Sequence, residues 1–133
     1  MIRLTGNVCR GYGIATRTLR PVMGLVESRI GLGPLRPGTL NVLLPAPYIV
    51  SPDALIQAYE YPLFREVIKL QRCRIGRIRA VIVRPSTHEL GKAHGPAYLE
   101  LAAKVNLRDC LRLADGDEIT VEVGGDARWW RGW

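Results

Sequence analysis

Short apolar runs, separated by polar residues, Pro or Gly, recur along the whole chain of 133 residues. Residues 2–10 alternate loosely between apolar and polar side chains and residues 118–123 alternate cleanly, which is typical of strands with one buried face. The same reasoning predicts a strand at 39–44, two strands between 66 and 85 that meet near Gly76, and a strand at 98–105. The pattern therefore predicts six short strands.

Helical signals are few and short. Pro21 suits a first helical position and apolar residues follow at helical spacing, so residues 21–30 are expected to form a helix that Gly31 ends. Ser51-Pro52-Asp53 has the character of a helix start and predicts a helix over 54–59. Residues 106–111 are expected to form a helical turn, and residues 85–96 a polar loop.

Six strands with only small helices predict a mostly-β fold, closed into a barrel because closure removes exposed strand edges. We expect residues 1–123 to form this single domain. Residues 124–133 then form a C-terminal tail that holds all three tryptophans, Trp129, Trp130 and Trp133.

Composition places the chain among globular proteins of the cytoplasm. Hydrophobic residues make up 47% of it, but no apolar run approaches the roughly 20 residues of a membrane span. Residues 1–6 lack the pattern of a signal peptide. Cys9, Cys73 and Cys110 stand far apart, which argues against disulfides and against a structural zinc site.

The basic charge changes this picture. Nineteen basic residues against 12 acidic ones give a net charge of +7, and residues 67–100 alone hold seven basic and two acidic residues. Such a balance suits a polyanionic partner, either nucleic acid or the phosphates of a nucleotide, and the alternative is an ordinary solvated surface. The arginines of this stretch are expected to line outward faces or a cleft: Arg72, Arg74, Arg77, Arg79 and Arg84.

Three features are candidates for chemistry. Thr39 and Asn41 stand two residues apart in a strand and so share a face, where their neutral oxygens suit Mg²⁺ or simply satisfy a turn. The glycines of Gly11-Tyr12-Gly13 follow the first strand, where they cradle phosphate or form a tight turn. His88 and His94 have possible metal spacing but no third ligand.

Four segments occur in one order along the chain and, as a set, carry a resemblance. They are Gly11-Tyr12-Gly13, Pro37-Gly38-Thr39-Leu40-Asn41, Arg84-Pro85-Ser86-Thr87-His88, and Leu99-Glu100-Leu101-Ala102-Ala103-Lys104-Val105-Asn106-Leu107-Arg108 running into Leu113-Ala114-Asp115-Gly116-Asp117-Glu118. The set resembles the archaeal CTP-dependent riboflavin kinases over most of residues 4–123.

The resemblance implies a six-stranded cradle-loop barrel that phosphorylates the 5′-hydroxyl of riboflavin to FMN, with CTP as donor and Mg²⁺ as cofactor. It implies magnesium ligands at Thr39 and Asn41 and flavin contacts at Thr87 and Glu100. The implied nucleotide contacts are Gly11, Tyr12, Gly13, Ile14, Ala15, Thr16, Val105, Asn106, Leu107 and Arg108.

Several assignments remain open at this stage. Phosphoryl transfer mainly requires positioning of the reactants and stabilisation of the charge on the phosphates. Glu100 is the candidate to orient or deprotonate the attacking hydroxyl, and His88 is an alternative base. Ser86 is an alternative to Thr87. The chain also departs from the family pattern: Ala15 stands where a glycine is usual, and Arg36 where an aromatic residue precedes Pro-Gly.

Two other functions compete with the kinase. One is a flavin- or nucleotide-binding barrel without catalysis. The other is a basic barrel that binds nucleic acid through residues 65–84, with the tail tryptophans stacked on bases. We expect the kinase: a cytoplasmic monomer whose partners are riboflavin or FMN and CTP or CDP, with neither membrane nor nucleic acid.

Overall fold

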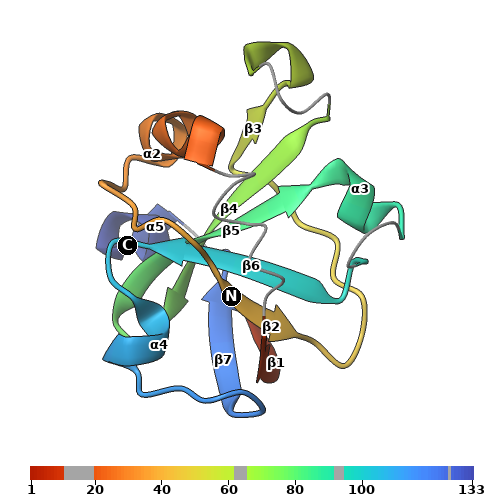
Figure 1. Cartoon of the computed structure of the whole chain (residues 1–133). Coiled ribbons are helices and arrows are strands. Elements are labelled where there is room, and N and C mark those ends of the chain that lie inside the picture. Colours follow the sequence, from red (N-terminus) through yellow and green to blue (C-terminus); the bar gives the residue numbers. More distant parts are fainter. Residues whose placement is uncertain (11–19, 62–65, 92–94, 126) are drawn as a thin grey trace.

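Seven antiparallel strands form one sheet in a computed structural model that describes residues 1–10, 20–61, 66–91, 95–125 and 127–133 (Figure 1). The strands are β1 (Ile2–Cys9), β2 (Leu40–Leu43), β3 (Ala54–Ile56), β4 (Ile68–Ile75), β5 (Ile78–Pro85), β6 (Tyr98–Ala103) and β7 (Glu118–Val123). Six of them follow the order β4-β5-β6-β2-β1-β7, and pairing of Cys73 with Val123 closes β7 onto β4. The closed six-stranded barrel predicted from the sequence is confirmed.

The barrel interior is filled by alternate residues of its strands. Leu40 and Val42 on β2 point inward with Leu99 and Leu101 on β6, as the two-residue period of a strand requires. Gly6 on β1 lets the barrel close tightly, because a Cβ there would lie 2.5 Å from the carbonyl oxygen of Leu43.

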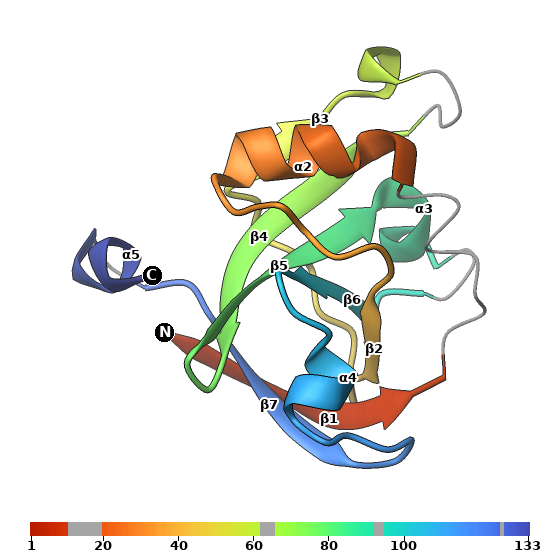
Figure 2. The same cartoon turned by 60° about the vertical axis from the view of Figure 1, so that its left-hand side comes forward.

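A second hydrophobic cluster covers the outer face of β4, β5 and β6. It is formed by a 3₁₀ turn, η1 (Arg20–Val22), and by helix α2 (Met23–Ile30), which lies across β4 in Figure 2. Val26 and Ile30 pack here in the same cluster as Val81 and Ala102. The expected helix at 21–30 is thus confirmed, and Gly31 ends it with a positive φ of 74°.

The helix expected over 54–59 is wrong. Residues 54–56 are β3, which pairs with the edge of β4, and a 3₁₀ turn, η2 (Ala58–Glu60), follows. Asp53 joins the sheet instead of capping a helix: its N–H donates to the carbonyl of Leu70 (2.8 Å), and its Oδ2 accepts from the N–H of Arg72 (2.7 Å). Pairing of residues 54–56 with β4 is favoured over a helix because it buries Ile56 completely.

Three short helices complete the described chain: α3 (Ser86–Glu89), α4 (Leu107–Cys110) and α5 (Ala127–Gly132). The sequence predicts a loop over residues 85–96, but residues 86–89 form α3, because the N–H of Leu90 donates to the carbonyl of Ser86 (3.2 Å) and closes a helical turn. Asn106 caps α4 as its side chain accepts from the N–H of Asp109 (3.1 Å), which confirms the turn at 106–111. None of the helices in the described ranges is long and apolar enough to cross a membrane.

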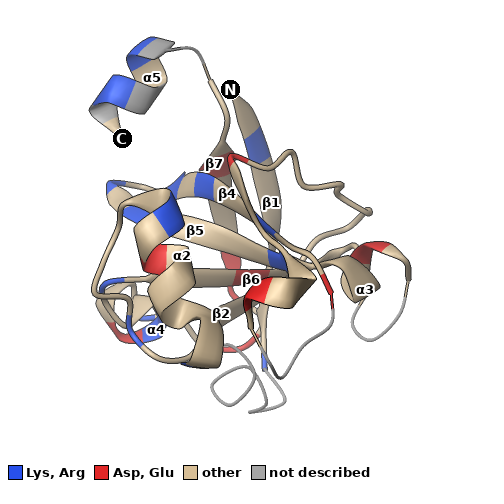
Figure 3. Ribbon diagram, turned by 90° about the horizontal axis from the view of Figure 1, so that it is seen from above, with Lys and Arg blue, Asp and Glu red and all other residues tan. Residues whose placement is uncertain are grey.

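The C-terminal tail contacts the β4–β5 hairpin through Trp129 and Trp133. Nε1 of Trp133 donates to the carbonyl of Cys73 (2.9 Å), and the guanidinium carbons of Arg72 and Arg79 lie 5.3 and 5.5 Å from the centre of the Trp133 ring. Arg74 lies 5.1 Å from the centre of the Trp129 ring. The described basic residues are spread over several elements, among them β4, α2 and α5 (Figure 3).

Arg84 corrects the expectation that the arginines of this hairpin line outward faces or a cleft. Its exposed fraction is 0%, because position 84 falls on the same face of β5 as the inward-pointing Ala80 and Ile82. The sequence offers no sign of this, since arginine is rarely fully buried unless its charge is paired.

Candidate functional site

The centre of the site is a row of three residues on neighbouring strands. Asn41 on β2 pairs with Glu100 on β6 and, on its other side, with Cys9 at the end of β1. Residues opposite one another in an antiparallel pair have Cβ atoms about 5 Å apart and share a face. This face is the outer one, because the flanking residues of Asn41 and Glu100 point into the barrel.

Thr39 extends the row at the start of β2. Its hydroxyl donates to Oδ1 of Asn41 over 3.2 Å. Two neighbouring ligands of an octahedral Mg²⁺ ion are about 3.0 Å apart, since each lies about 2.1 Å from the metal. The spacing and the chemistry of these two oxygens therefore fit Mg²⁺, with water and phosphate oxygens to complete its shell.

A metal site built on histidine finds no support. In the part of the chain that the structure describes, no group of three His, Cys, Asp or Glu residues is placed to hold a metal. His94 lies outside the described residues. His88 is buried, with its ring edge-on to the ring of Tyr98 at a centroid distance of 6.3 Å.

A pocket of about 190 Å³ lies between the start of β2 and the end of β6, beside α4. It brings the Pro-Gly-Thr segment together with the second predicted nucleotide segment, and its lining comprises Arg36, Pro37, Gly38, Thr39, Leu40, Leu101, Ala103, Val105, Asn106, Leu107 and Arg108. Among the described residues, two arginines and no carboxylate line this pocket, which suits an anionic ligand.

The two arginines of the pocket differ in their partners. Arg108 forms an ion pair with Asp115 (2.9 Å), and its Nη2 donates to the carbonyl of Cys9 (3.4 Å). Arg36 is anchored by its backbone N–H, which donates to the carbonyl of Ala103 (2.8 Å), and it forms no ion pair with a described residue. The sequence motifs did not include Arg36 among the site residues. The one feature that could have indicated it is its position directly before the Pro37-Gly38 turn.

Glu100 is the buried carboxyl of the row, with an exposed fraction of 7%. Burial raises its pKa to about 7, against a smaller lowering by the charge of Arg84. Among the described residues, none donates a hydrogen bond to this carboxylate or forms an ion pair with it. A carboxyl with a pKa near neutrality is suited to accept a proton from a substrate hydroxyl.

Helix α3 carries the other predicted flavin contact. The Thr87 hydroxyl donates to Oε1 of Glu66 over 3.2 Å, so Glu66 joins this part of the site although no motif pointed to it. The next residue, His88, packs on Tyr98, which lies two residues before Glu100 on the same face of β6. Thus α3 stands at the beginning of β6, and the arginine-lined pocket at its end.

The first nucleotide segment, Gly11, Tyr12, Gly13, Ile14, Ala15 and Thr16, lies outside the described residues. The strand that leads into it ends at Cys9, the register partner of Asn41.

Comparisons with known proteins point to one family. A family model that carries the name CTP-dependent riboflavin kinase and the description "domain of unknown function DUF120" matches residues 8–123. A riboflavin kinase of Thermococcus kodakarensis is 35% identical over 128 residues, which are 90% of this chain and 58% of that protein. A riboflavin kinase of Pyrobaculum arsenaticum is 33% identical over 133 residues, 92% of this chain and 60% of that protein. For a riboflavin kinase of Ignicoccus hospitalis the identity is 32% over 130 residues, 92% of this chain and 71% of that protein. The chain thus spans about 60% of the length of the first two relatives.

Proposed function

This chain belongs to the CTP-dependent riboflavin kinase family, and from that premise we propose that it transfers the γ-phosphoryl group of CTP to the 5′-hydroxyl of riboflavin. The products are FMN and CDP. The observation that best supports the proposal is the position of Thr39, which lines the arginine pocket and also contacts Asn41, the register partner of Glu100. An anion pocket, a pair of metal-type oxygens and a buried carboxyl therefore follow one another along β2 and β6.

The arginine pocket is the proposed donor site. Arg36 and Arg108 face the phosphates of CTP from opposite segments, with the backbone of residues 105–108 around the nucleotide. We assign residues 11–16 to the same phosphates, because they follow β1 in the chain and the last residue of β1, Cys9, is the register partner of Asn41. Thr39 and Asn41 would hold Mg²⁺, which when bound offsets the negative charge on the transferred phosphoryl group.

The row at Asn41 and Glu100 is the proposed transfer site. The Glu100 carboxylate takes the proton of the ribityl 5′-hydroxyl. The oxygen of that hydroxyl forms a bond to the γ-phosphorus of CTP, while the bond from this phosphorus to the bridging oxygen breaks and CDP leaves. Thr87, on α3, contacts the flavin at the beginning of β6. The proton acceptor is Glu100 rather than His88, because the His88 ring packs on Tyr98, whereas the Glu100 carboxyl is adjacent to Asn41.

The test is direct conversion. Purified protein is incubated with riboflavin, Mg²⁺ and each of CTP, ATP, GTP and UTP, and FMN is separated by chromatography. We expect FMN with CTP, no FMN when Mg²⁺ is chelated, and loss of turnover in Asn41→Ala. Thr120→Val serves as a control, because that hydroxyl is paired with the Thr5 hydroxyl away from the site. Absence of FMN with all four nucleotides would overturn the proposal, and binding without turnover would favour the non-catalytic barrel.

Nucleic-acid binding through residues 65–84 is the less favoured function. Arg72, Arg74 and Arg79 are engaged with tail tryptophans. Arg84 is buried in the barrel. These contacts occupy four of the arginines on which that hypothesis depended.

A further inference from the structure

Arg84 takes no part in the proposed transfer, yet it is the largest fully buried side chain among the described residues. We propose that Arg84 is a positioning residue that holds together, from inside the barrel, the three segments that form the flavin end of the site. The proposal rests on the proposed function, since it assigns flavin binding to that end.

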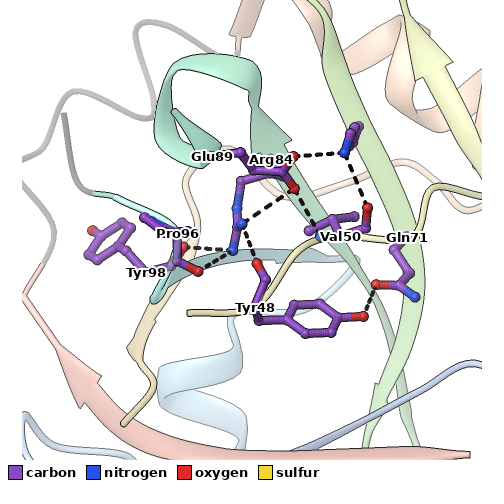
Figure 4. A network of polar contacts seen from close by, with 8 residues as sticks. Tyr48, Val50, Gln71, Arg84, Glu89, Pro96 and Tyr98 are labelled. Atoms are coloured by element: carbon purple, nitrogen blue, oxygen red, sulfur yellow. Dashed lines mark hydrogen bonds and ion pairs between the residues drawn. The ribbon is translucent and has the colours of Figure 1, made fainter. Parts of the chain in front are cut away.

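The Arg84 guanidinium binds the backbone of two segments that are distant in sequence (Figure 4). Its Nη1 donates to the carbonyl of Tyr48 (2.7 Å), in the segment that follows β2. Its Nη2 donates to the carbonyls of Pro96 (3.1 Å) and Tyr98 (3.3 Å), at the beginning of β6. The planar fork of arginine matches such a set of acceptors, whereas the lysine ammonium is a single point charge on a flexible stem.

The third segment is joined through Glu89, the last residue of α3. Oε1 of Glu89 lies 3.5 Å from Nη1 of Arg84 and accepts from the N–H of Val50 (2.8 Å). Oε2 of Glu89 accepts from Nζ of Lys69 (2.7 Å). Burial raises the pKa of Glu89, but the bonds from Lys69 and Val50 outweigh this and hold that pKa below its ordinary value. The network therefore keeps the Glu89 carboxylate charged and paired at the C-terminal end of α3.

Two of these anchor points, Tyr98 and Glu89, lie close in the chain to proposed flavin residues. Tyr98 is two residues before Glu100, and Glu89 is two residues after Thr87 and next to His88. The segment held at Tyr48 and Val50 follows β2, which carries Asn41. Loss of Arg84 removes the guanidinium donor from the carbonyls of Tyr48, Pro96 and Tyr98 and one of the two cations beside Glu89, so these segments are expected to shift relative to one another.

The donor pocket lies outside this network. It is formed at the other end of β6, and the five steps along the strand from Tyr98 to Ala103 cover about 17 Å. None of the residues that line the pocket bonds to Arg84 or Glu89. A positioning role at the flavin end thus predicts an effect on riboflavin and not on CTP, whereas general loosening of the barrel would affect both.

The experiment compares Arg84→Met and Arg84→Lys with Arg77→Met, an exposed arginine of the same hairpin. Riboflavin Kd is measured by flavin fluorescence without nucleotide, and KM for riboflavin and for CTP in the kinase assay. We expect Arg84→Met to raise the riboflavin Kd and KM about tenfold or more and to change the CTP KM less than about twofold. Arg84→Lys should remain impaired, because it retains the charge without the fork, and Arg77→Met should match the wild type.

An unchanged riboflavin Kd in Arg84→Met, or equal increases in both KM values, would overturn the proposal. If Arg84→Met does not fold, as judged by circular dichroism, Glu89→Gln replaces it. That variant keeps the carbonyl bonds of Arg84 but removes the charge that holds α3, and it must show the same selective increase for riboflavin for the proposal to stand. A wild-type protein that binds riboflavin but forms no FMN from any nucleotide contradicts the kinase function alone, since the Kd comparison still decides the role of Arg84.

Discussion

Asn41 and Glu100 are register partners across β2 and β6, so a neutral amide rather than a basic side chain faces the buried carboxyl. A cation at position 41 would lower the pKa of Glu100 by stabilising its charged form. With an amide there, burial dominates and the pKa rises to about 7. The pairing therefore leaves Glu100 able to exchange a proton near neutral pH, beside the oxygens suited to Mg²⁺.

Glu100→Gln should stabilise the protein at alkaline pH. The folded pKa of Glu100 is about 7 against an ordinary value of 4.5, so the stability due to its protonated form is complete below pH 4.5 and is lost as the pH rises through 7. We expect this group to lower the free energy of unfolding of the wild type by up to about 3 kcal/mol between pH 5 and 8. Urea unfolding of both proteins at the two pH values tests this; an identical pH dependence in the variant would contradict it.

The same pKa predicts the acid limb of activity. If Glu100 accepts the proton, kcat/KM for riboflavin should rise about tenfold per pH unit below 7 and level off above it. Glu100→Gln should lose most of its activity and retain a pH-independent remainder. A pH profile measured at saturating CTP and Mg²⁺ decides the matter, and a limb that persists in the variant would assign the proton to another group.

The two proposed Mg²⁺ ligands, Thr39 and Asn41, should respond unequally to substitution. Asn41→Ala removes a carbonyl oxygen and should lower kcat by about 100-fold or more, whereas Thr39→Val should raise the Mg²⁺ concentration for half-maximal activity about tenfold. Magnesium titrations of FMN formation measure both effects. Thr120→Val is the matched control for Thr39→Val, and equal behaviour of those two variants would remove Thr39 from the metal site.

Arg36→Ala should weaken CTP binding at the proposed donor site, because the substitution removes a positive charge. Arg36 lines the pocket and has no ion-pair partner among the described residues, so its full charge is available to phosphate. We expect the CTP KM to rise about tenfold at low salt and the difference from wild type to shrink as salt screens the interaction. Arg77→Ala provides the comparison at equal net charge. An effect of the same size there would show that only overall charge matters.

Trp133→Ala should weaken the fold without affecting the site. The substitution removes the contacts with Arg72 and Arg79 and the hydrogen bond to Cys73, at a cost of about 1–3 kcal/mol in the free energy of unfolding. Both KM values should stay at their wild-type levels. Denaturant unfolding and the kinase assay are the two measurements, and a raised CTP or riboflavin KM would connect the tail to the site.

Much of the fold could be predicted from local patterns. Alternation identified β1 and β7, and apolar runs around Gly76 identified β4 and β5, because the two-residue period of a half-buried strand is written directly in the sequence. The expectation at residues 54–59 failed because Ser51-Pro52-Asp53 indicates a helix locally, while pairing of Ala54–Ile56 with β4 is a long-range gain that no local signal contains.

The candidate site, like the fold, was only partly predictable from the sequence. The sequence by itself determined that Thr39 and Asn41 share a face, since that follows from their spacing on a strand, and its motifs pointed to the segments at 84–88 and 99–108. Only the tertiary structure decided that Asn41 faces Glu100, that Arg36 and Arg108 line one pocket, and that Arg84 is buried inside the barrel. These relations depend on strand register and barrel closure, which bring together residues about 60 positions apart and set how far each charge is removed from water.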